Sequence, residues 1–568
     1  MSLGEDREAN TDILSIGRSV AAFFESRENP GHSRVLGQLC ERLAIRTSEG
    51  TSHLVPEEYE DLCSDPSVFS AVGKPGDFSP LILTGHKKLY FQKYFEYERM
   101  VADAFSFRAK KPVRKISSEV KEYFDGYVRQ FLDPGQAIAV GVALQRSLSL
   151  LTGGPGTGKT RTLAYILACM FRQDPHLRVA LCAPTGKAAH RMQRSLLQAI
   201  EQSELPADSR EALRECSRAS TLHRLLGPVH GSVEFKKNSQ NKLLYQLIVV
   251  DEASMIDLPL MAKLCDALPE NTDLILCGDA DQLSPVQGGP VFSSLIRGTN
   301  ANAFSSEQVA DLSFFAPSEI MQNPPLLSPL AGCTVKLSRA HRRNDSSGND
   351  AIGDLCSAIR EGRGDDALSV VRENNHSVQW IDSLDDPSVN DLIYAGFESL
   401  QCAHAPESAL DSLVHFKILC AHNQGKYGVD AWNLRAQSLL ELGDNKAVPV
   451  VIGVNDYSIR LFNGDDGVVM NDQVYFSEID QVHSVSRSRL PSHLLGYAGS
   501  IHRSQGSEYD HVLIILPPPE AQMLTRELLY VAVSRAKLGV TIVGDLSAFL
   551  SAVNQPEKST SGLVEQLK

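Results

Sequence analysis

Ser147-Leu-Ser-Leu-Leu-Thr-Gly-Gly-Pro-Gly-Thr-Gly-Lys-Thr160 is an apolar run that passes directly into a glycine-rich loop. The pattern predicts a buried strand before the loop and a helix over 160–171 after it, a context that disfavours a chance glycine-rich turn. Glycines let backbone N–H groups wrap phosphates, while Lys159 can reach the β and γ oxygens and Thr160 can ligate Mg²⁺. The expected phosphate loop comprises Gly153, Gly154, Pro155, Gly156, Thr157, Gly158, Lys159 and Thr160.

Short apolar runs of similar composition recur along the chain, and each ends in Gly, Pro or an acidic residue. Amphipathic segments such as 187–202 lie between some of them, which is typical of a buried parallel sheet with helices on both faces. The runs form an early set at 147–154, 178–184, 244–252 and 273–279, and a late set at 416–422, 511–517 and 539–545. The two sets predict two tandem α/β domains.

The segment 447–482 has a different texture, with short alternating runs separated by ND and NGDDG turns. This pattern predicts a small antiparallel β module. A chain of 568 residues is too long for a single core. We therefore expect a mainly helical N-terminal domain at 1–110, a first α/β domain at 111–335, a second at 336–444 and 496–553, the β insertion at 445–495, and a frayed polar tail at 554–568.

The composition indicates a globular protein of the cytosol. Hydrophobic residues make up 42% of the chain and charged residues 22%. The segment 1–10 is acidic and has no apolar core, which argues against a secretory signal, and no apolar run is long enough to span a membrane. The eleven cysteines are scattered without a CxxC or CxxxC pair. We expect mostly buried, reduced thiols, with no zinc or iron–sulfur site.

The net charge of −14, taken alone, argues against a nucleic-acid-binding protein. Phosphate contacts need only a local basic groove, however, so the charge of the whole chain does not exclude one. The segment 105–117 packs five basic residues beside one proline. Its two interpretations are a solvated linker, which we favour, and a DNA-facing patch.

Two polar features follow later strands of the first predicted sheet. Asp251 closes the run IVVD, where its carboxylate can hold Mg²⁺, and the adjacent Glu252 can polarise an attacking water. The strand that ends in GDADQL places Gln282 where its amide can sense a γ-phosphate. Because both features come after a phosphate loop, they indicate hydrolysis of a nucleoside triphosphate.

Two arginines in the second half of the chain are candidates for the same reaction. Arg342 lies in SRAHRR and Arg535 in LYVAVSRAK. Charge that spreads over the γ-phosphate during hydrolysis is stabilised by a guanidinium from a second domain, which also couples domain closure to the chemistry. A surface salt bridge is the ordinary interpretation of one arginine, but for Arg535 we favour the functional one.

The order of these motifs resembles that of the superfamily 1 helicases. The strings GGPGTGKT, APTGKAA, TLHRLLG, VVDEAS, GDADQLSPV, HRSQGSEYD and YVAVSRAK follow one another as they do there. The variants are most similar to the RecD branch, the alpha subunit of exodeoxyribonuclease V, over about 133–545. The resemblance implies two RecA-like motor domains with an SH3-like β insertion, and ATP-dependent 5′-to-3′ translocation on single-stranded DNA with Mg²⁺.

The resemblance also implies partners and site residues. The partners would be single-stranded DNA, duplex ends, and RecB-like and RecC-like subunits of a repair complex in the bacterial cytosol. Gln136 falls at the adenine-reading glutamine, and Arg342 and Arg535 fall at the two arginine fingers. The DNA-facing motifs would contribute Pro184, Thr185, His223, His502 and Ser504.

This sequence departs from the family pattern at two positions. His341 stands where an aromatic residue usually stacks on adenine, which puts base affinity in doubt. Arg503 replaces the more usual lysine, a mild change for a phosphate contact. No spare carboxylate cluster suggests a nuclease. A stand-alone RecD-like helicase and a non-motor nucleotide switch are the alternatives, and the intact Lys159, Asp251 and Glu252 argue against the switch.

The N-terminal region carries an aromatic band, LYFQKYFEYE at 89–98, which resembles an aromatic signature of the family. On a helix, positions 90, 94 and 97 would share one face, with 91 and 95 beside it. One interpretation is that the band packs into this domain and onto the first motor domain. The other is that part of it docks on a partner subunit, because aromatic side chains are enriched at interfaces.

Overall fold

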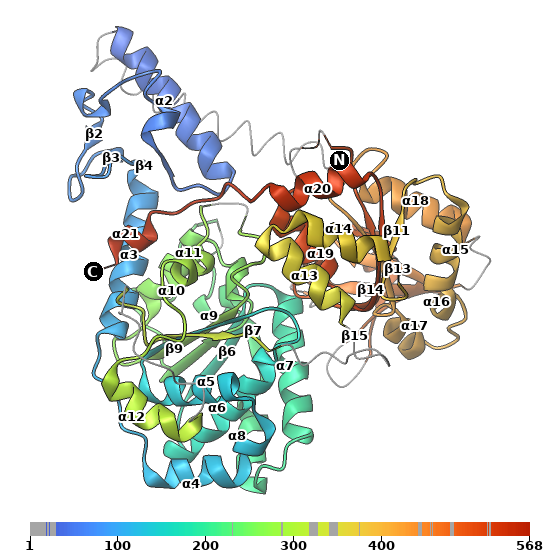
Figure 1. The fold of residues 1–568 in the computed structure, drawn as a ribbon, viewed down its shortest axis with the longest axis horizontal. Coiled ribbons are helices and arrows are strands. Elements are labelled where there is room, and N and C mark those ends of the chain that lie inside the picture. The colour runs from blue at the N-terminus through green and yellow to red at the C-terminus, as the bar shows by residue number, and fades with distance from the viewer. Residues whose placement is uncertain are drawn as a thin grey trace.

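The computed structural model describes residues 19, 22 and 30–567, except 230, 286–287, 317–327, 340–349, 374, 441–445, 455, 457, 460, 478–481, 520 and 522–523. Two sheet-and-helix bodies lie side by side, one formed by the cyan-to-green part of the chain and one by the yellow-to-red part (Figure 1). Each is built around a parallel sheet, as the alternating apolar runs predicted. The expected fold class is confirmed.

The first body contains a six-stranded sheet of order β10-β5-β9-β8-β6-β7, in which all neighbouring strands are parallel. Its strands are β5 (Leu148–Gly153), β6 (Val179–Ala183), β7 (Ala219–Thr221), β8 (Leu247–Val250), β9 (Asp273–Gly278) and β10 (Thr334–Leu337). Its helices are α4 (Ser118–Tyr127), α5 (Pro134–Gln145), α6 (Lys159–Gln173), α7 (Gly186–Glu201), α8 (Ala207–Cys216), α9 (Leu222–Leu226), α10 (Leu258–Ala267), α11 (Phe292–Arg297) and α12 (Ser306–Phe315). The short edge strands β7 and β10 were not predicted, because each has too few apolar residues to stand out.

The second body contains a five-stranded parallel sheet of order β11-β20-β19-β12-β18. Its strands are β11 (Val378–Ile381), β12 (Phe416–Cys420), β18 (Ala498–Ser500), β19 (Tyr509–Ile515) and β20 (Ala536–Val543). Its helices are α13 (Ala351–Glu361), α14 (Gly364–Glu373), α15 (Pro387–Gly396), α16 (Glu398–Gln401), α17 (Pro406–Ser412), α18 (Val429–Leu439), α19 (Arg526–Ser534) and α20 (Leu546–Asn554).

A five-stranded antiparallel sheet of order β16-β15-β14-β13-β17 is inserted between α18 and β18. It comprises β13 (Val448–Ile452), β14 (Asp466–Met470), β15 (Gln473–Ser477), β16 (Val482–Ser486) and β17 (His493–Leu495). Alternating side chains such as Val474 and Phe476 are buried on one face, as the period of two in the sequence predicted.

The N-terminal region contains two long helices and a small sheet that the sequence did not predict. Its elements are α2 (Pro30–Ser48), β1 (His53–Leu54), β2 (Val72–Gly73), β3 (Leu81–Leu83), β4 (Leu89–Phe91) and α3 (Gln92–Ala109), with the strands in the order β1-β4-β3-β2. The aromatic band therefore begins as a strand and becomes a helix only at Gln92. This change of period splits the band between two cores.

The aromatic side chains at 89–97 are all buried or half-buried within the chain. Leu89 and Phe91 pack into the core of the N-terminal sheet, and Phe95 packs against Tyr90 and Ile82. The side chains of Tyr94 and Tyr97 pack on the core of the first body. The band is internal packing, and the idea that it forms a docking face is not supported.

The basic stretch at 105–117 also belongs to the first body. Arg108 is buried and donates to the backbone oxygens of Thr272 (3.2 Å) and Pro269 (2.8 Å). Arg114 pairs with Asp273 at 2.6 Å. Both interpretations from the sequence, a solvated linker and a DNA-facing patch, were wrong for these two arginines, because Arg108 of α3 and Arg114 after it hold the chain to the amino end of β9.

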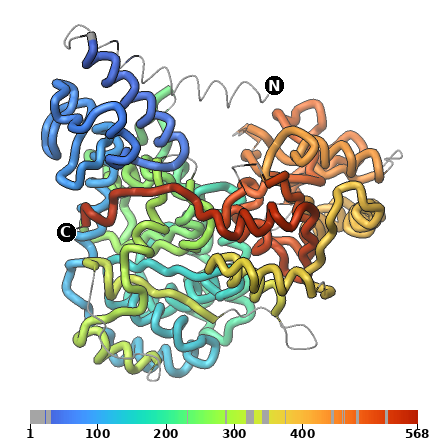
Figure 2. The backbone as a smooth tube through the Cα atoms, turned by 45° about the horizontal axis from the view of Figure 1, so that its top comes forward, coloured from blue at the N-terminus to red at the C-terminus, as the bar shows by residue number. Residues whose placement is uncertain are grey.

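The C-terminal tail is ordered in the structure, contrary to the expectation of a frayed end. It leaves α20, crosses the first body and ends in α21 (Leu563–Gln566) beside α3, as both views show (Figures 1 and 2). Polar composition suggested fraying, but the polar groups of the tail find partners on the N-terminal region. The tail thus connects the second body to the opposite end of the molecule.

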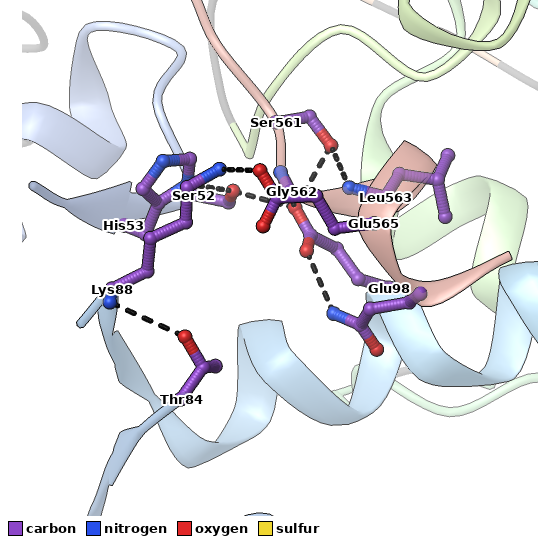
Figure 3. Close-up of polar contacts among 10 residues, drawn as sticks. Ser52, His53, Thr84, Lys88, Glu98, Ser561, Gly562, Leu563 and Glu565 are labelled. Carbon is purple, nitrogen blue, oxygen red and sulfur yellow. Dashed lines mark hydrogen bonds and ion pairs between the residues drawn. The ribbon is translucent and has the colours of Figure 1, made fainter. Parts of the chain in front are cut away.

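Glu98 is the residue that receives the tail. Its side chain is 0% exposed, and it accepts hydrogen bonds from Ser52 Oγ (2.6 Å), Ser561 Oγ (2.8 Å), the backbone N–H of Gly562 (3.0 Å) and Gln566 Nε2 (2.9 Å) (Figure 3). Burial raises the pKa of Glu98, whereas the hydrogen bonds from Ser52, Ser561 and Gly562 oppose the rise. A buried carboxyl group needs such donors to offset its desolvation.

We expect Glu98→Ala to lower the free energy of unfolding by about 1–3 kcal/mol, because it leaves buried donors without an acceptor. The tail should also become cleavable by trypsin after Lys558, which is exposed. Glu98→Gln keeps one oxygen for three of the donors and should stay close to wild type. The matched control is Glu96→Ala on the same helix, which removes a surface pair with Arg99. Equal effects of the Glu96 and Glu98 variants would contradict the role of Glu98.

The eleven cysteines are free thiols, and most of them are buried, as expected. Burial raises the pKa of the Cys265 thiol to about 12, for example. In the part of the chain that the structure describes, no helix has the length and hydropathy needed to cross a bilayer.

Candidate nucleotide-binding and DNA-binding site

The phosphate loop lies between β5 and α6, as predicted. Gly156 and Gly158 have φ angles of 76° and 77°, a left-handed conformation that glycine adopts without strain. Lys159 is the first residue of α6, and its Nζ donates to the backbone oxygens of Gly153 (2.7 Å) and Gly154 (3.2 Å). The ammonium group is therefore held over the loop, at the N-terminus of a helix, where anions bind.

The loop opens into a cleft of about 470 Å³ between the two bodies. Residues 155–161 form one wall with Asp251, Glu252 and Gln282, and the second body contributes Glu508 and Arg535. Residues from both halves of the sequence thus meet at one site. A cleft whose lining includes cations from two domains suits a polyanionic ligand.

The acidic pair lies at the carboxyl end of β8. The backbone N–H of Asp251 donates to Cys182 O at 2.9 Å, which fixes the strand end, and the side chain is 8% exposed. Burial and the neighbouring Glu252 raise the pKa of Asp251, while Lys159 opposes the rise. Glu252 has a φ of 51°, a strained conformation for a residue with a side chain. Such strain concentrates at active sites.

The donor set beside the loop fits Mg²⁺. Asp251 offers a carboxylate and Thr160 a hydroxyl group, and Mg²⁺ in nucleotide sites is held by one or two such groups together with phosphate oxygens and water. Within the described residues, no group of three or more His, Cys, Asp or Glu could hold a metal ion without such help. A buried carboxylate, Asp251, beside the half-buried Glu252 favours a cation at this position.

Gln282 is buried, lines the cleft and donates from Nε2 to Asp279 Oδ2 at 3.2 Å. The same carboxylate oxygen accepts a hydrogen bond from the hydroxyl of Tyr530 at 3.0 Å. Tyr530 belongs to α19 of the second body. The predicted γ-phosphate sensor is thus joined to the other domain through Asp279.

Arg535 follows α19 and is 2% exposed. Its guanidinium donates to the backbone oxygens of Ser507 (3.1 Å) and Val531 (3.2 Å), and Nη2 donates to Ser534 Oγ (3.1 Å). Burial lowers the pKa of Arg535, and the carboxylate of Glu252 acts against this. The predicted arginine therefore faces the acidic end of β8 across the domain boundary.

Three further residues, Gln136, His341 and Arg342, were predicted for the nucleotide. Gln136 is buried, and its Nε2 donates to Thr157 O at 3.0 Å while its Oε1 accepts from the backbone of Asp133 at 3.1 Å. It therefore supports the phosphate loop, and a role in reading adenine stays a prediction. His341 and Arg342 lie outside the described residues.

The DNA-facing candidates lie at the carboxyl ends of adjacent strands. Pro184 and Thr185 follow β6, and His223 follows β7, which pairs with β6 at Ala183 and Thr221. His502 follows β18 in the second body; it is half-buried, and burial lowers its pKa. Ser504 is 3% exposed and donates its hydroxyl to Ile501 O at 2.7 Å, so this side chain serves the turn itself.

Comparison with known proteins agrees with this geometry. Residues 136–288 match an AAA domain, and residues 495–543 match a UvrD-like helicase C-terminal domain. The RecBCD enzyme subunit RecD from Mycolicibacterium smegmatis is 34% identical over 499 residues, which cover 84% of this chain and 82% of that protein. The chain belongs to the RecD family. As a RecD family member it is a superfamily 1 DNA helicase with ATPase activity.

Two further similarities are weaker. The ATP-dependent RecD2 DNA helicase of Deinococcus radiodurans is 27% identical, over 87% of this chain but 61% of that protein. The crystal structure of Pif1 helicase from Candida albicans is 18% identical, with a TM-score of 0.38 over 77% of this chain and 98% of that one.

Sequence reasoning missed several residues of this RecD family site. Arg191 of α7 lines the nucleotide cleft and pairs with Glu508 at 2.8 Å. Tyr530 and Asp279 join the two bodies. Asp279 and Glu508 lie inside strings that the sequence had singled out, but Arg191 lies in an ordinary amphipathic helix, where no local pattern distinguishes it.

Proposed function

We propose that the chain is an ATP-driven, 5′-to-3′ translocase on single-stranded DNA that works as a subunit of a RecBCD-type complex. The observation that supports this most is the nucleotide cleft lined by Lys159, Glu252 and, from the second body, Arg535. A site shared by two domains couples hydrolysis to their relative movement, as translocation requires.

In this proposal the loop and Lys159 bind the β- and γ-phosphates, and Thr160 and Asp251 hold Mg²⁺, which neutralises phosphate charge when bound. Glu252 polarises the attacking water, and Gln282 reports the γ-phosphate through Asp279 and Tyr530. Arg535 stabilises charge that develops during hydrolysis. We also assign Arg342 to this role, and Gln136 and His341 to the base, from the family resemblance alone.

Single-stranded DNA would cross the carboxyl ends of both sheets, where Pro184, Thr185, His223 and His502 lie. His223 is exposed, and its ring centroid lies 5.7 Å from that of Phe235; an exposed ring suits contact with a base. Ser504 would act through the shape of its turn. These contacts are local, which is compatible with a net charge of −14.

Assembly with RecB-like and RecC-like subunits is proposed because the relatives at 34% identity are RecBCD subunits. The domain at 1–110 is the proposed docking part, through its surface and not through the buried aromatic band. Phe78 is 98% exposed and Val68 is 57% exposed there. A stand-alone helicase is the second candidate. The observation in its support is the weaker similarity to RecD2.

We expect the purified chain to hydrolyse ATP faster when single-stranded DNA is added, and to unwind duplexes with a 5′ tail in preference to those with a 3′ tail. The 5′-to-3′ polarity is the one that the family resemblance implies. Unwinding assays on matched 5′- and 3′-tailed substrates measure it, with blunt duplex as the control. A preference for the 3′ tail would contradict the proposed direction, and co-purification from the native host distinguishes complex from stand-alone protein.

A further inference from the structure

Helix α7 of the first body contacts the second body and the β insertion beside the cleft. Lys187 and Arg191 are four residues apart, so they share one face of the helix. Lys187 pairs with Asp466 of the β insertion, and Arg191 Nη2 pairs with Glu508 Oε1 at 2.8 Å. A Cβ added to Gly506 would lie only 3.7 Å from the Cβ of Ala188, between the two pairs. Helix α7 is thus held by contacts with the β insertion and with the second body.

Arg191 occupies the part of this contact that borders the proposed nucleotide cleft. Its side chain is 36% exposed and that of Glu508 is 21% exposed, and both line the cleft. Burial alone would lower the pKa of Arg191, but the carboxylates of Glu508 and Glu252 outweigh it and raise the pKa. The guanidinium is therefore held as a cation by its ion pair with Glu508 of the second body, and the charge of Glu252 in the first body favours the same state.

The loop that carries Glu508 is also held by Arg535. The backbone oxygen of Ser507 accepts from Arg535 Nη1 at 3.1 Å, and the backbone N–H of Tyr509 donates to Arg535 O at 2.8 Å. Residues on both sides of Glu508 thus contact the arginine finger. A displacement of Glu508 would therefore also displace the backbone groups of Ser507 and Tyr509 that hydrogen-bond with Arg535.

The same, N-terminal end of α7 begins at the loop that we propose faces DNA. The side-chain oxygen of Thr185 accepts from the backbone N–H of Ala188, which caps the helix. Arg191 lies less than two turns further along. The first turns of α7 therefore connect the proposed DNA contact to the nucleotide cleft within a single rigid element.

We propose that Arg191 is a positioning residue, which through its ion pair with Glu508 couples the DNA-facing end of α7 to the placement of Arg535 at the nucleotide. The inference rests on the proposed roles of Thr185 and Arg535. A shift of α7 on DNA binding would be transmitted as a displacement of Glu508, since the two side chains are joined at the domain boundary. Such a contact can couple two sites energetically when binding at each site changes the position of the same structural element, here α7.

The test compares ATP hydrolysis by full-length Arg191→Ala with and without single-stranded DNA. We expect stimulation of kcat by DNA to fall about tenfold, with a smaller loss in the basal rate, because coupling between sites is typically worth 5- to 150-fold. Glu508→Gln should have the same effect. Arg191→Lys keeps the charge but not the guanidinium geometry and should be intermediate. Arg194→Ala, at an exposed position of the same helix, is the matched control.

A double-mutant cycle decides between coupling and a direct phosphate contact. If the pair acts as a unit, the Arg191→Ala and Glu508→Gln effects are not additive, and exchanging the charges in Arg191→Glu with Glu508→Arg restores part of the stimulation. Additive effects, or equal losses with and without DNA, overturn the proposal. A loss of nucleotide affinity in Arg191→Ala that Glu508→Gln does not share also overturns it, because Arg191 would then bind phosphate.

These outcomes are separate from a failure of the proposed function. If the wild-type chain shows no stimulation by single-stranded DNA, the proposed function fails before any variant is compared. If the wild type is stimulated and Arg191→Ala is stimulated equally, only the coupling role of Arg191 is wrong. Circular dichroism of each variant confirms folding, and Arg191→Lys provides the comparison should the alanine variant not fold.

Discussion

Replacing Lys159 by glutamine is expected to lower the DNA-stimulated rate of ATP hydrolysis on the order of 10²–10³-fold, the usual effect of losing an electrostatic contact to the transition state. The ammonium group lies over the phosphate loop, 2.7 Å from Gly153 O, where it would meet the β- and γ-phosphates. Glutamine has similar length but no charge. Steady-state ATPase assays at saturating ATP and DNA measure the change.

Glu252→Gln should produce a loss of similar size for a different reason. The substitution preserves shape but removes the carboxylate that polarises the attacking water, so nucleotide binding should persist while turnover stops. Lys110→Gln, at an exposed position at the end of α3, is the control for loss of a lysine charge. Near wild-type turnover in either site variant would show that the catalytic assignment is wrong.

Arg535→Ala is expected to abolish turnover more than nucleotide binding. The guanidinium is needed as charge develops on the transferred phosphoryl group, so kcat should fall on the order of 10³-fold or more while affinity for ATP changes little. Arg535 is also 2% exposed and donates three hydrogen bonds. A loss of packing must therefore be separated from a loss of catalysis.

Arg535→Lys makes this separation, because it retains a buried cation but cannot reproduce the fork of donors. Thermal unfolding of both variants shows whether the second body remains folded, and a fluorescent ATP analogue measures binding. If Arg535→Ala lowers the affinity for ATP but leaves kcat unchanged, Arg535 contacts the bound nucleotide in the ground state only. A lysine variant with full activity would exclude the need for a guanidinium.

The sequence by itself determined the features that depend on neighbouring residues. The strand, loop and helix around Gly153 and Lys159 were predicted from three consecutive patterns. These are an apolar run, glycines that tolerate left-handed φ and an amphipathic segment. The buried strands ending at Val250 and Gly278 were predicted for the same reason. The order of the motifs was sufficient to identify the family.

The tertiary structure alone decided which polar and aromatic groups find partners. The tail looked frayed because it is polar, yet Ser561 and Gly562 meet the buried carboxylate of Glu98. Arg108 looked like part of a linker, yet it donates to backbone oxygens just before β9 of the first sheet. A polar side chain has the same local pattern whether its partner is water or a residue hundreds of positions away.

The site shows the same division. The sequence named Lys159, Asp251, Glu252, Gln282 and Arg535, each in a short string whose chemistry is local, and the structure brings these five to one cleft. The sequence could not identify Arg191, because an arginine on an amphipathic helix is ordinarily solvated. Only the approach of the second body places Glu508 within 2.8 Å of it, and that approach is set by packing between domains, which no local pattern records.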